Sequence, residues 1–396
     1  MSSVVPRMRS LDGLRGAAAL VVVFHHVSLA ARPELGEAAW AWLTGSPLKL
    51  LFPGSEAVLV FFVLSGLVVA LPALQGGRPG SSGFSWAKYY PARLLRLYLP
   101  VFAVLLMSAA LIVLLPRDRS AMPAGSWMAD TNATAVTPLS LLSEASLARR
   151  SYDIDNVLWS LRWEVVFSLL LPVFVWIALR LAWHPLVSMA ACLVATVLGR
   201  VLEAAALVYL PLFLLGSILA AQLHSPRRGS RLAGGAEADG GAALVPASAR
   251  RPPWLLPLAA VLAGALLVAS WLVRPLDPPP IVRTIAWGLA GAGAALTVVL
   301  AVAWPLLRCG LETRPLQWLG KVSFSLYLVH VPILATLVYL FGSSRWWVAG
   351  LVAVPLSLVV AALFQRWIEA PSHRLARAVG ARAGVLGARI SGRRDA

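Results

Sequence analysis

Two ionisable side chains stand at the ends of an apolar run near the amino terminus. Arg15 and His26 are 11 residues apart and enclose the segment GAAALVVVFH. On a helix this spacing is about three turns and about 20°, so both residues lie on one face, about 16.5 Å apart along the axis, whereas His25 points about 100° away. An imidazole, with a reference pKa of about 6.5, suits a general base. The alternative is a packed histidine that bonds a neighbouring helix.

The segment YYPARLLRLYLP places Arg93 and Arg96 one helical turn apart at the beginning of another apolar run. Two guanidinium groups on one face suit a phosphate or pyrophosphate, because each can form paired hydrogen bonds with phosphate oxygens. Anchoring of the span by positive residues at the cytoplasmic surface explains the same pattern. A phosphate site and a simple orientation signal therefore both remain open from this segment alone.

A carboxylate lies inside the apolar segment NVLWSLRWEVVFSLLLP. Glu164 and Arg162 are two residues apart and do not face each other on a helix, so each needs a separate partner or a watery cavity. Glu164 could orient a histidine, or bind a sugar hydroxyl or a cation. Trp159 and Trp163 share a face, which suits stacking on a sugar ring or a position in the interfacial aromatic belt.

The segment GKVSFSLYLVHVPIL carries a polar stripe. Ser323, Tyr327 and His330 follow one another at spacings of four and three, so they line one face of a helix. Such a stripe could contact a substrate or form hydrogen bonds between helices. Further along, RWIEAPSHR places Glu369 and Pro371 just after the last apolar run, where the proline is expected to end the helix.

The composition explains which elements must position these side chains. Of the 396 residues, 59% are hydrophobic and 13% are charged, with a mean hydropathy of +0.78. This predicts an all-α integral membrane protein. The net charge of +17 does not indicate nucleic-acid binding, because the basic residues lie in short segments between apolar runs. Cys192 and Cys309 suggest neither a disulfide framework nor a metal site.

A helix needs about 20 apolar residues to span a bilayer, and about ten segments qualify. They are 14–31, 55–74, 97–115, 158–179, 186–199, 204–223, 254–273, 284–305, 322–341 and 347–365, of which the fifth is short and could be tilted or re-entrant. With the amino terminus inside, 23 of the 34 Lys and Arg residues lie on the inner side and 10 on the outer side. This asymmetry predicts a multi-pass protein of the cell's inner membrane with both termini in the cytoplasm.

The remaining segments complete the expected organisation. Residues 1–375 form one transmembrane domain, interrupted by a polar outer loop at 116–157 and a flexible, basic inner loop at 224–253. Residues 376–396 form a basic cytoplasmic tail that is solvated or faces lipid headgroups. The excess of Arg and Ala over Lys favours a bacterial source.

Six motifs follow one another along nearly the whole chain. They are LDGLRGAAALVVVFHH with Arg15 and His26, FFVLSGLV with Ser65, ARLLRLYLP with Arg93 and Arg96, WSLRWEVVFSLLLP with Glu164, GKVSFSLYLVHVP with Tyr327 and His330, and IEAP with Glu369. In this order they resemble acyltransferase family 3, membrane proteins that O-acetylate bacterial surface polysaccharides, peptidoglycan and some antibiotics. The chain departs from the family pattern at Ala92, which replaces a usual basic residue, and at Pro100, which is displaced.

The resemblance implies transfer of an acyl group, usually acetyl, from cytoplasmic acyl-CoA to a hydroxyl, often on the far side of the membrane. It implies essential roles for the arginine and histidine of the first helix and for the arginines of the third. The expected site is assigned as follows: His26 as base, with Arg15, Glu164 and Tyr327, for catalysis; Arg93, Arg96 and Ser65 for acyl-CoA; Trp159, Ser323 and His330 for the acceptor. No metal is expected.

Three alternatives remain open at this stage. The acceptor could be a carbohydrate or glycosylated molecule, or a macrolide-type natural product. Ionisable residues at mid-membrane depth are also typical of a secondary transporter or flippase, which would need no acyl-CoA site. A structural or assembly partner is the third reading, although buried charges argue against it. The oligomeric state is left open.

Overall fold

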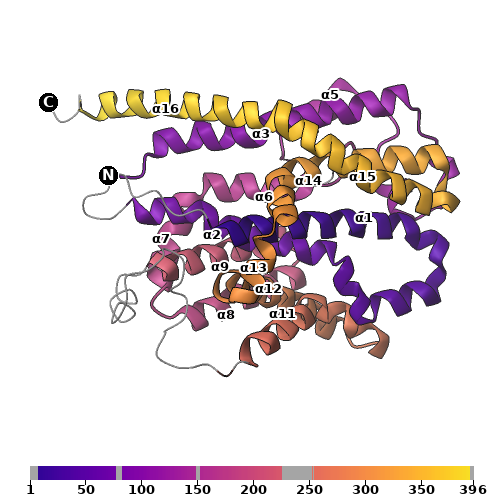
Figure 1. Ribbon diagram of the computed structural model, residues 1–396, viewed down its shortest axis with the longest axis horizontal. Helices are drawn as coiled ribbons and strands as arrows, with labels where there is room; N and C mark the ends of the chain where they lie inside the picture. The colour runs from indigo at the N-terminus through magenta and orange to yellow at the C-terminus, as the bar shows by residue number, and fades with distance from the viewer. Residues whose placement is uncertain (1–7, 77–82, 149–151, 225–251, 253, 393–396) are drawn as a thin grey trace. The chain divides into compact units, whose positions relative to one another are not determined.

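The computed structural model describes residues 8–76, 83–148, 152–224, 252 and 254–392, and over this part of the chain the regular elements are all helices (Figure 1). The contacts divide the chain into two compact units. Unit 1 contains Met1–Val22, Ala41–Phe84 and Leu170–Lys321, and unit 2 contains Val23–Trp40, Ser85–Leu169 and Val322–Ala396.

Eight helical stretches in the described residues are long and apolar enough to span a membrane. They are α1 Arg9–Thr44, α2 Gly54–Gln75, α3 Trp86–Leu114, α9 Ala205–His224, α11 Leu255–Leu272, α12 Pro280–Ala303, α14 Arg314–Phe341 and the stretch Ser343–Arg389 that includes α15 Trp346–Phe364. A broken pair of helices brings the number to nine. The prediction of an all-α, multi-span membrane protein is therefore confirmed.

Two of the ten expected spans differ from a full uninterrupted helix. The segment at 158–179 is broken at Leu170, where α6 Leu158–Leu169 ends and α7 Leu171–Leu181 begins. Pro172 lies in the first turn of α7, where its missing N–H group costs no helical hydrogen bond. The fifth segment forms α8 Pro185–Val201, whose 17 residues extend only about 25 Å, less than a typical hydrocarbon core.

Unit 1 is held together by close helix pairs that depend on glycine. Gly66 of α2 and Gly216 of α9 lie against the backbone of the facing helix, and a side chain at either position would meet the carbonyl oxygen of Phe213 or Val63. Small residues at such positions allow two membrane helices to approach closely. The other described elements of unit 1 are α7, α8, α11, α12, η1 Pro47–Leu51, η3 Arg274–Leu276, α13 Pro305–Leu311, the amino-terminal turns and the last turn of α1, and the first turns of α14.

Unit 2 contains the polar stripe of α14 and the elements around it. The expected outer loop at 116–157 is structured by short helices: η2 Arg119–Ala121, α4 Trp127–Thr131 and α5 Pro138–Ala145. Helix α3 begins at Trp86, about three turns earlier than the expected span, so Arg93 and Arg96 lie within the helix. The expected inner loop at 224–253 lies almost entirely outside the described residues.

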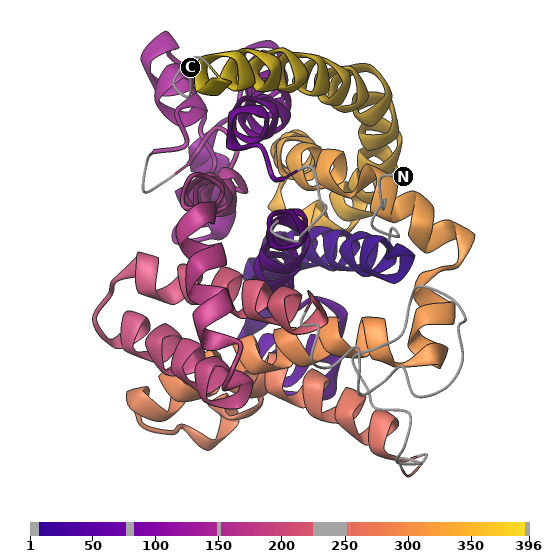
Figure 2. The same ribbon diagram turned by 90° about the vertical axis from the view of Figure 1, so that its left-hand side faces the viewer.

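The carboxyl-terminal region is helical beyond the last apolar run. A π-helical turn at Gln365–Glu369 follows α15, and α16 Ala370–Gly392 continues from it and packs along α3 (Figures 1 and 2). The expectation that Pro371 ends the helix is wrong, because the chain stays helical through it: a π turn lies immediately before the proline, where the N–H of Ala370 donates to the carbonyl oxygen of Gln365. The boundary drawn at residue 375 lies inside α16.

Candidate active site

Two histidines from distant parts of the sequence meet inside unit 2. Nδ1 of His26 on α1 lies 3.1 Å from Nε2 of His330 on α14, and the second ring nitrogen of His330 lies 2.9 Å from the carbonyl oxygen of Leu326. Both side chains are buried, with 8% and 1% of their surface exposed. The imidazole rings therefore form a hydrogen-bonded chain that begins at the backbone of α14.

The backbone carbonyl determines the direction of this chain. A carbonyl oxygen can only accept, so Nδ1 of His330 must donate to Leu326. When both rings are neutral, Nε2 of His330 then accepts from Nδ1–H of His26, and Nε2 of His26 carries a lone pair. Position 330 thus holds His26 in the tautomer that a general base requires, as an orienting group does for the histidine of a catalytic triad.

Aromatic and hydroxyl groups surround the two histidines. The ring of Trp127, from the short helix α4 of the outer loop, lies 5.1 Å from the ring of His26. One turn before His330, the hydroxyl of Tyr327 lies 2.7 Å from Oγ of Ser160 and donates to the carbonyl oxygen of Val157 at 3.3 Å. Tyr327 is thereby fixed by α6, with its ring 6.0 Å from that of His330.

A second polar cluster pairs charges. Arg93 of α3 forms a hydrogen-bonded ion pair with Glu164 of α6, and its Nε donates to Oγ of Ser168 at 3.1 Å. Tyr89 donates to the carbonyl oxygen of Ser168 at 3.3 Å. The side chains of Arg93 and Glu164 are 16% and 11% exposed, so the pair is largely removed from solvent. Glu164 therefore meets an arginine here and not a histidine.

One face of α6 connects the two clusters. Ser160, Glu164 and Ser168 are four residues apart and point to the same side of the helix. The first contacts Tyr327, and the other two contact Arg93. Successive positions rise by about 6 Å, so the cationic cluster lies one to two turns from the tyrosine along this helix.

Arg96 and two residues of the carboxyl-terminal region form a third group. Arg96 is exposed one turn after Arg93 and acts electrostatically on His373 of α16. Glu369, in the π turn, accepts from Oγ of Ser325 at 2.6 Å and lies 3.8 Å from Nε2 of His373. The Glu-x-Pro motif therefore joins α14 to α16.

The other expected site residues lie in different places. Arg15 and Ser65 belong to unit 1, where Arg15 lies 4.0 Å from Asp12 and Ser65 is half-buried on α2. Trp159 is half-buried on α6 and Ser323 is buried on α14, both in unit 2. The structure thus brings His26 together with His330, and Arg93 with Glu164.

The outer loop contributes two buried carboxyl groups that the motifs did not reveal. Glu144 accepts from the backbone N–H groups of Asp153, Ile154 and Asp155 at 2.8, 2.9 and 3.3 Å. The side chain of Asp155 is fully buried, and within the described residues neither of its oxygens has a hydrogen-bond partner. Burial, together with the nearby charge of Glu144, raises the pKa of Asp155 well above its usual value.

Arg117 fixes the beginning of the same loop. Its guanidinium donates to the carbonyl oxygen of Ala133 and to Oγ1 of Thr336, each at 3.0 Å, and lies 5.5 Å from the ring centre of Tyr339. Burial lowers the pKa of Arg117 to about 10. The loop is therefore tied to α14, the helix that carries the histidine and the tyrosine.

Sequence reasoning missed three residues of this region: Trp127, Ser168 and Asp155. Trp127 follows Ser126, which caps α4 by accepting from the N–H group of Ala129, and this capping signal is visible in the sequence. Ser168 continues the four-residue spacing from Ser160 and Glu164. The burial of Asp155 has no such local signal, because it depends on packing.

Comparison with known proteins agrees with this geometry. A family model described as an acyltransferase domain matches residues 8–366, which include both histidines and the Arg93–Glu164 pair. No curated protein and no solved structure matches the chain. The match favours a transferase over the transporter that composition alone allowed. The chain belongs to acyltransferase family 3 and is a multi-pass membrane acyltransferase.

Proposed function

We propose that this membrane acyltransferase transfers an acyl group, in the first instance acetyl, from cytoplasmic acyl-CoA to a hydroxyl of a carbohydrate or glycosylated acceptor. His26 is the general base of this reaction. The enzyme would act in the cytoplasmic membrane of a bacterium.

The observation that carries the proposal is the hydrogen-bonded chain from Leu326 through His330 to His26. It leaves Nε2 of His26 as the basic nitrogen of a buried imidazole. A transporter needs no such fixed tautomer, whereas removal of a proton from a hydroxyl requires a lone pair in a defined direction. His330, which we first assigned to the acceptor, is better understood as the residue that positions His26.

In this reaction the acceptor oxygen replaces the coenzyme A sulfur at the thioester carbonyl carbon. The acceptor oxygen attacks the carbonyl carbon while its proton passes to Nε2 of His26, and a C–O bond forms. The C–S bond then breaks, and the coenzyme A sulfur takes the proton back from the imidazolium. The oxyanion formed in between needs a donor. The hydroxyl of Tyr327, one turn from His330, is a candidate donor for this role, in which its single proton would turn from the carbonyl oxygen of Val157 to the oxyanion.

The cationic cluster supports binding of the donor. Arg96 is exposed, and Arg93 is held in place by Glu164 and Ser168, so a phosphate would meet an already oriented guanidinium. Because Glu164 neutralises part of this charge, its role here is to position Arg93. For the acceptor, Trp159 and Ser323 lie on the two helices that meet at Tyr327 and remain candidates for sugar contacts.

The test uses purified protein in lipid nanodiscs with radiolabelled acetyl-CoA and a panel of sugars and glycosides. We expect acyl transfer by the wild type and a loss of about a hundredfold or more for His26→Ala, the usual contribution of a general base. His25→Ala is the control on the same helix: its ring lies 5.3 Å from that of His26 but is not part of the hydrogen-bonded chain from Leu326 through His330 to His26, so this variant should keep most of the activity. Full transfer by a correctly folded His26→Ala protein would refute the assignment of the base.

A further inference from the structure

The carboxyl-terminal helix α16 lies against α3 at very short range. A side chain at Gly380 would approach the carbonyl oxygen of Lys88 to 2.8 Å and Cβ of Ala92 to 2.9 Å, and one at Gly387 would approach Cβ of Ala87 to 2.9 Å. The numbering increases along one helix and decreases along the other, so the helices are antiparallel. The beginning of α16 therefore lies beside Arg93 and Arg96.

A buried carboxylate fixes this arrangement. Glu369 is 7% exposed; one oxygen accepts from Ser325 of α14 at 2.6 Å, and the other lies 3.8 Å from His373 of α16. The π turn that contains Glu369 sets the direction in which α16 leaves α15. The first turns of α16 are thus attached to the helix that carries His330.

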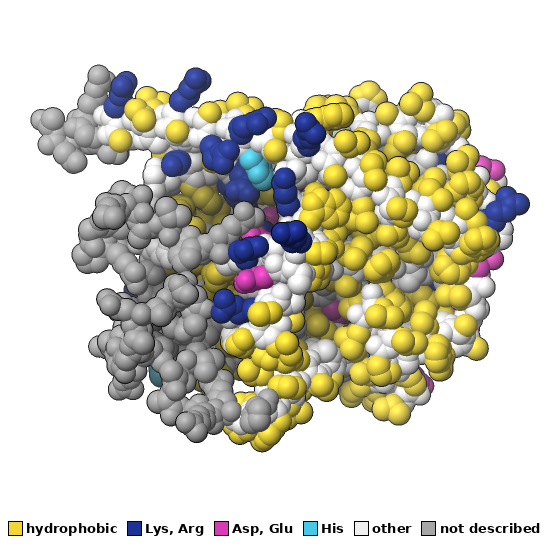
Figure 3. Space-filling model, in the orientation of Figure 1, with side chains coloured by type: hydrophobic (Ala, Val, Ile, Leu, Met, Phe, Trp, Pro, Cys, Tyr) yellow, Lys and Arg dark blue, Asp and Glu magenta, His cyan; other side chains and the backbone are white. Residues whose placement is uncertain are grey.

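Positive charge accumulates where α16 meets α3. Arg96, Arg377 and Arg93 all act electrostatically on His373, in that order of strength. The carboxylates that face these groups are Glu164, paired with Arg93, and Glu369, next to His373. Arg96 and Arg377 are both exposed, and Figure 3 shows Lys and Arg side chains gathered along α16. Guanidinium groups that all act on His373 also repel one another, and an anion bound between them would relieve that repulsion.

We propose that α16 forms the second wall of the donor site, in which Arg377 and His373 bind phosphate groups of acyl-CoA together with Arg96. Glu369 acts as a positioning residue that holds α16 in place. The inference rests on the proposed function. It extends the donor site beyond residues 8–366, which the family model matches, because His373 and Arg377 both follow residue 366. The recognised chemistry is a phosphate ester or pyrophosphate, which acyl-CoA and anionic lipid headgroups both carry.

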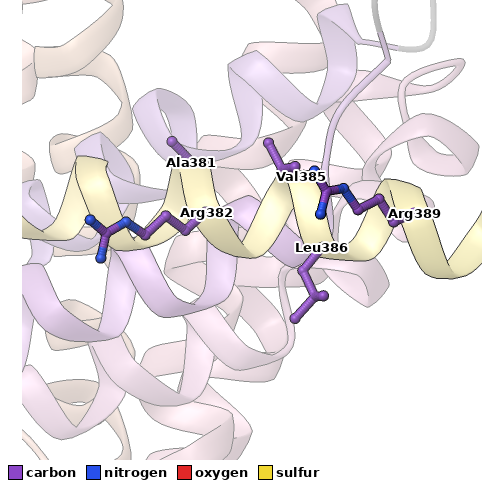
Figure 4. Close-up of a pocket in the computed structure, with 5 residues that line it drawn as sticks. All are labelled: Ala381, Arg382, Val385, Leu386 and Arg389. Atoms are coloured by element: carbon purple, nitrogen blue, oxygen red, sulfur yellow. The ribbon is translucent and has the colours of Figure 1, made fainter.

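The same helix offers a matched control. An open hollow of about 420 Å³ lies further along α16, lined by Ala381, Arg382, Val385, Leu386 and Arg389 (Figure 4). Arg389 is 12 residues after Arg377, about 18 Å along the axis, and lies towards the amino-terminal end of α3, away from Arg96. Arg377→Gln and Arg389→Gln remove the same charge from the same helix at different distances from the site.

The experiment measures the dissociation constant of coenzyme A and of 3′-dephospho-coenzyme A with the full chain in nanodiscs of zwitterionic lipid. We expect Arg377→Gln to weaken coenzyme A binding about tenfold, with a raised KM and a nearly unchanged kcat, and Arg389→Gln to leave both unchanged. An equal, small effect of both substitutions would overturn the proposal, since it would show that the net positive charge of α16 attracts coenzyme A without a specific phosphate contact at Arg377.

Nanodiscs that contain phosphatidylglycerol distinguish the two sources of phosphate. If Arg377→Gln changes only the dependence on anionic lipid and leaves coenzyme A affinity intact, the cluster is a headgroup site and the proposal is wrong. A wild-type protein that neither binds coenzyme A nor transfers acetyl groups contradicts the proposed function itself. Wild-type binding and transfer, with unchanged affinity in Arg377→Gln, contradicts the role of α16 alone.

The positioning role of Glu369 has its own readout. Glu369→Gln should raise KM for acetyl-CoA about threefold or more in the wild-type background. It should add little in a chain that already carries Arg377→Gln and His373→Gln, because it acts through those two residues. An equal effect of Glu369→Gln in both backgrounds would mean that Glu369 stabilises the folded protein and does not act through Arg377 and His373.

Discussion

The histidine pair and the arginine–glutamate pair are both buried in unit 2, but they satisfy their polar atoms differently. His26 and His330 bond each other, and the chain ends on a backbone carbonyl. Arg93 and Glu164 neutralise each other and share Ser168. The first arrangement can accept and return a proton without a change in its partners, whereas the second holds a fixed charge in a fixed direction.

This difference matches the two tasks that the proposed function requires. Proton transfer needs a group that changes charge, so a strong ionic partner at His26 would favour one charge state throughout the reaction. Phosphate binding needs a permanent cation whose side chain is already ordered, and a carboxylate next to Arg93 provides that order. The predictions below break each arrangement in turn.

The largest effect is expected at His330. His330→Leu removes the acceptor for Nδ1–H of His26 and frees the imidazole to adopt the other tautomer. We expect kcat to fall about a thousandfold, which is about 4 kcal/mol in the activation free energy, with little change in KM for acetyl-CoA. Single-turnover acetyl transfer measures the chemical step directly.

A milder variant at the same position sharpens this test. The side-chain oxygen of Gln can accept from His26 while its amide group donates, so His330→Gln should recover part of the lost rate. Equal activities of the Leu and Gln variants would show that position 330 contributes packing and not orientation.

The next effect is expected at the ion pair. Glu164→Gln leaves the guanidinium of Arg93 largely buried without its carboxylate, and breaking such a pair costs about 3 kcal/mol of stability. We expect a lower thermal transition temperature and a raised KM for acetyl-CoA, with kcat much less affected than in His330→Leu. Differential scanning fluorimetry and initial rates on the same sample give both values.

The result for a double variant distinguishes positioning from catalysis. If Glu164 acts through Arg93, then Glu164→Gln combined with Arg93→Gln should be no less active than Arg93→Gln alone. A large additional loss of kcat in the double variant would give Glu164 a catalytic role of its own.

Asp155 provides a smaller, pH-dependent comparison, because in the described part of the chain the oxygens of this buried carboxyl group have no hydrogen-bond partner. Its pKa in the folded protein lies above the unfolded value, so the folded state holds the proton more tightly. The stabilisation that this protonation provides is fully present below the unfolded pKa and is lost as the pH rises through the folded pKa. Asp155→Asn, which stays neutral, should therefore stabilise the protein at pH 8 and not at pH 4. Thermal unfolding at both pH values measures this, and a pH-independent difference would contradict it.

The sequence predicted the helices and most polar positions of the site but not their pairing. Spacing placed Tyr327 and His330 on one face of a helix, because that relation depends only on local geometry. The partners His26 and His330 are 304 residues apart, and Arg93 and Glu164 are 71 apart, so their meeting depends on how the helices pack. The break at Leu170 was missed because apolar composition alone does not show that Pro172 begins a new helix.

The smallest effect is expected at Ser160, where the two arrangements meet on α6. Ser160→Ala removes a hydrogen bond of 2.7 Å to the hydroxyl of Tyr327, but the carbonyl oxygen of Val157 still accepts from that hydroxyl. The loss should therefore be about 1 kcal/mol, seen as a fall in kcat of about fivefold without a change in KM for acetyl-CoA. Tyr327→Phe should lose more, since it removes the donor itself and not only its orientation. If instead Ser160→Ala raises KM as Glu164→Gln does, then this face of α6 serves donor binding along its whole length, and the tyrosine belongs with the arginines.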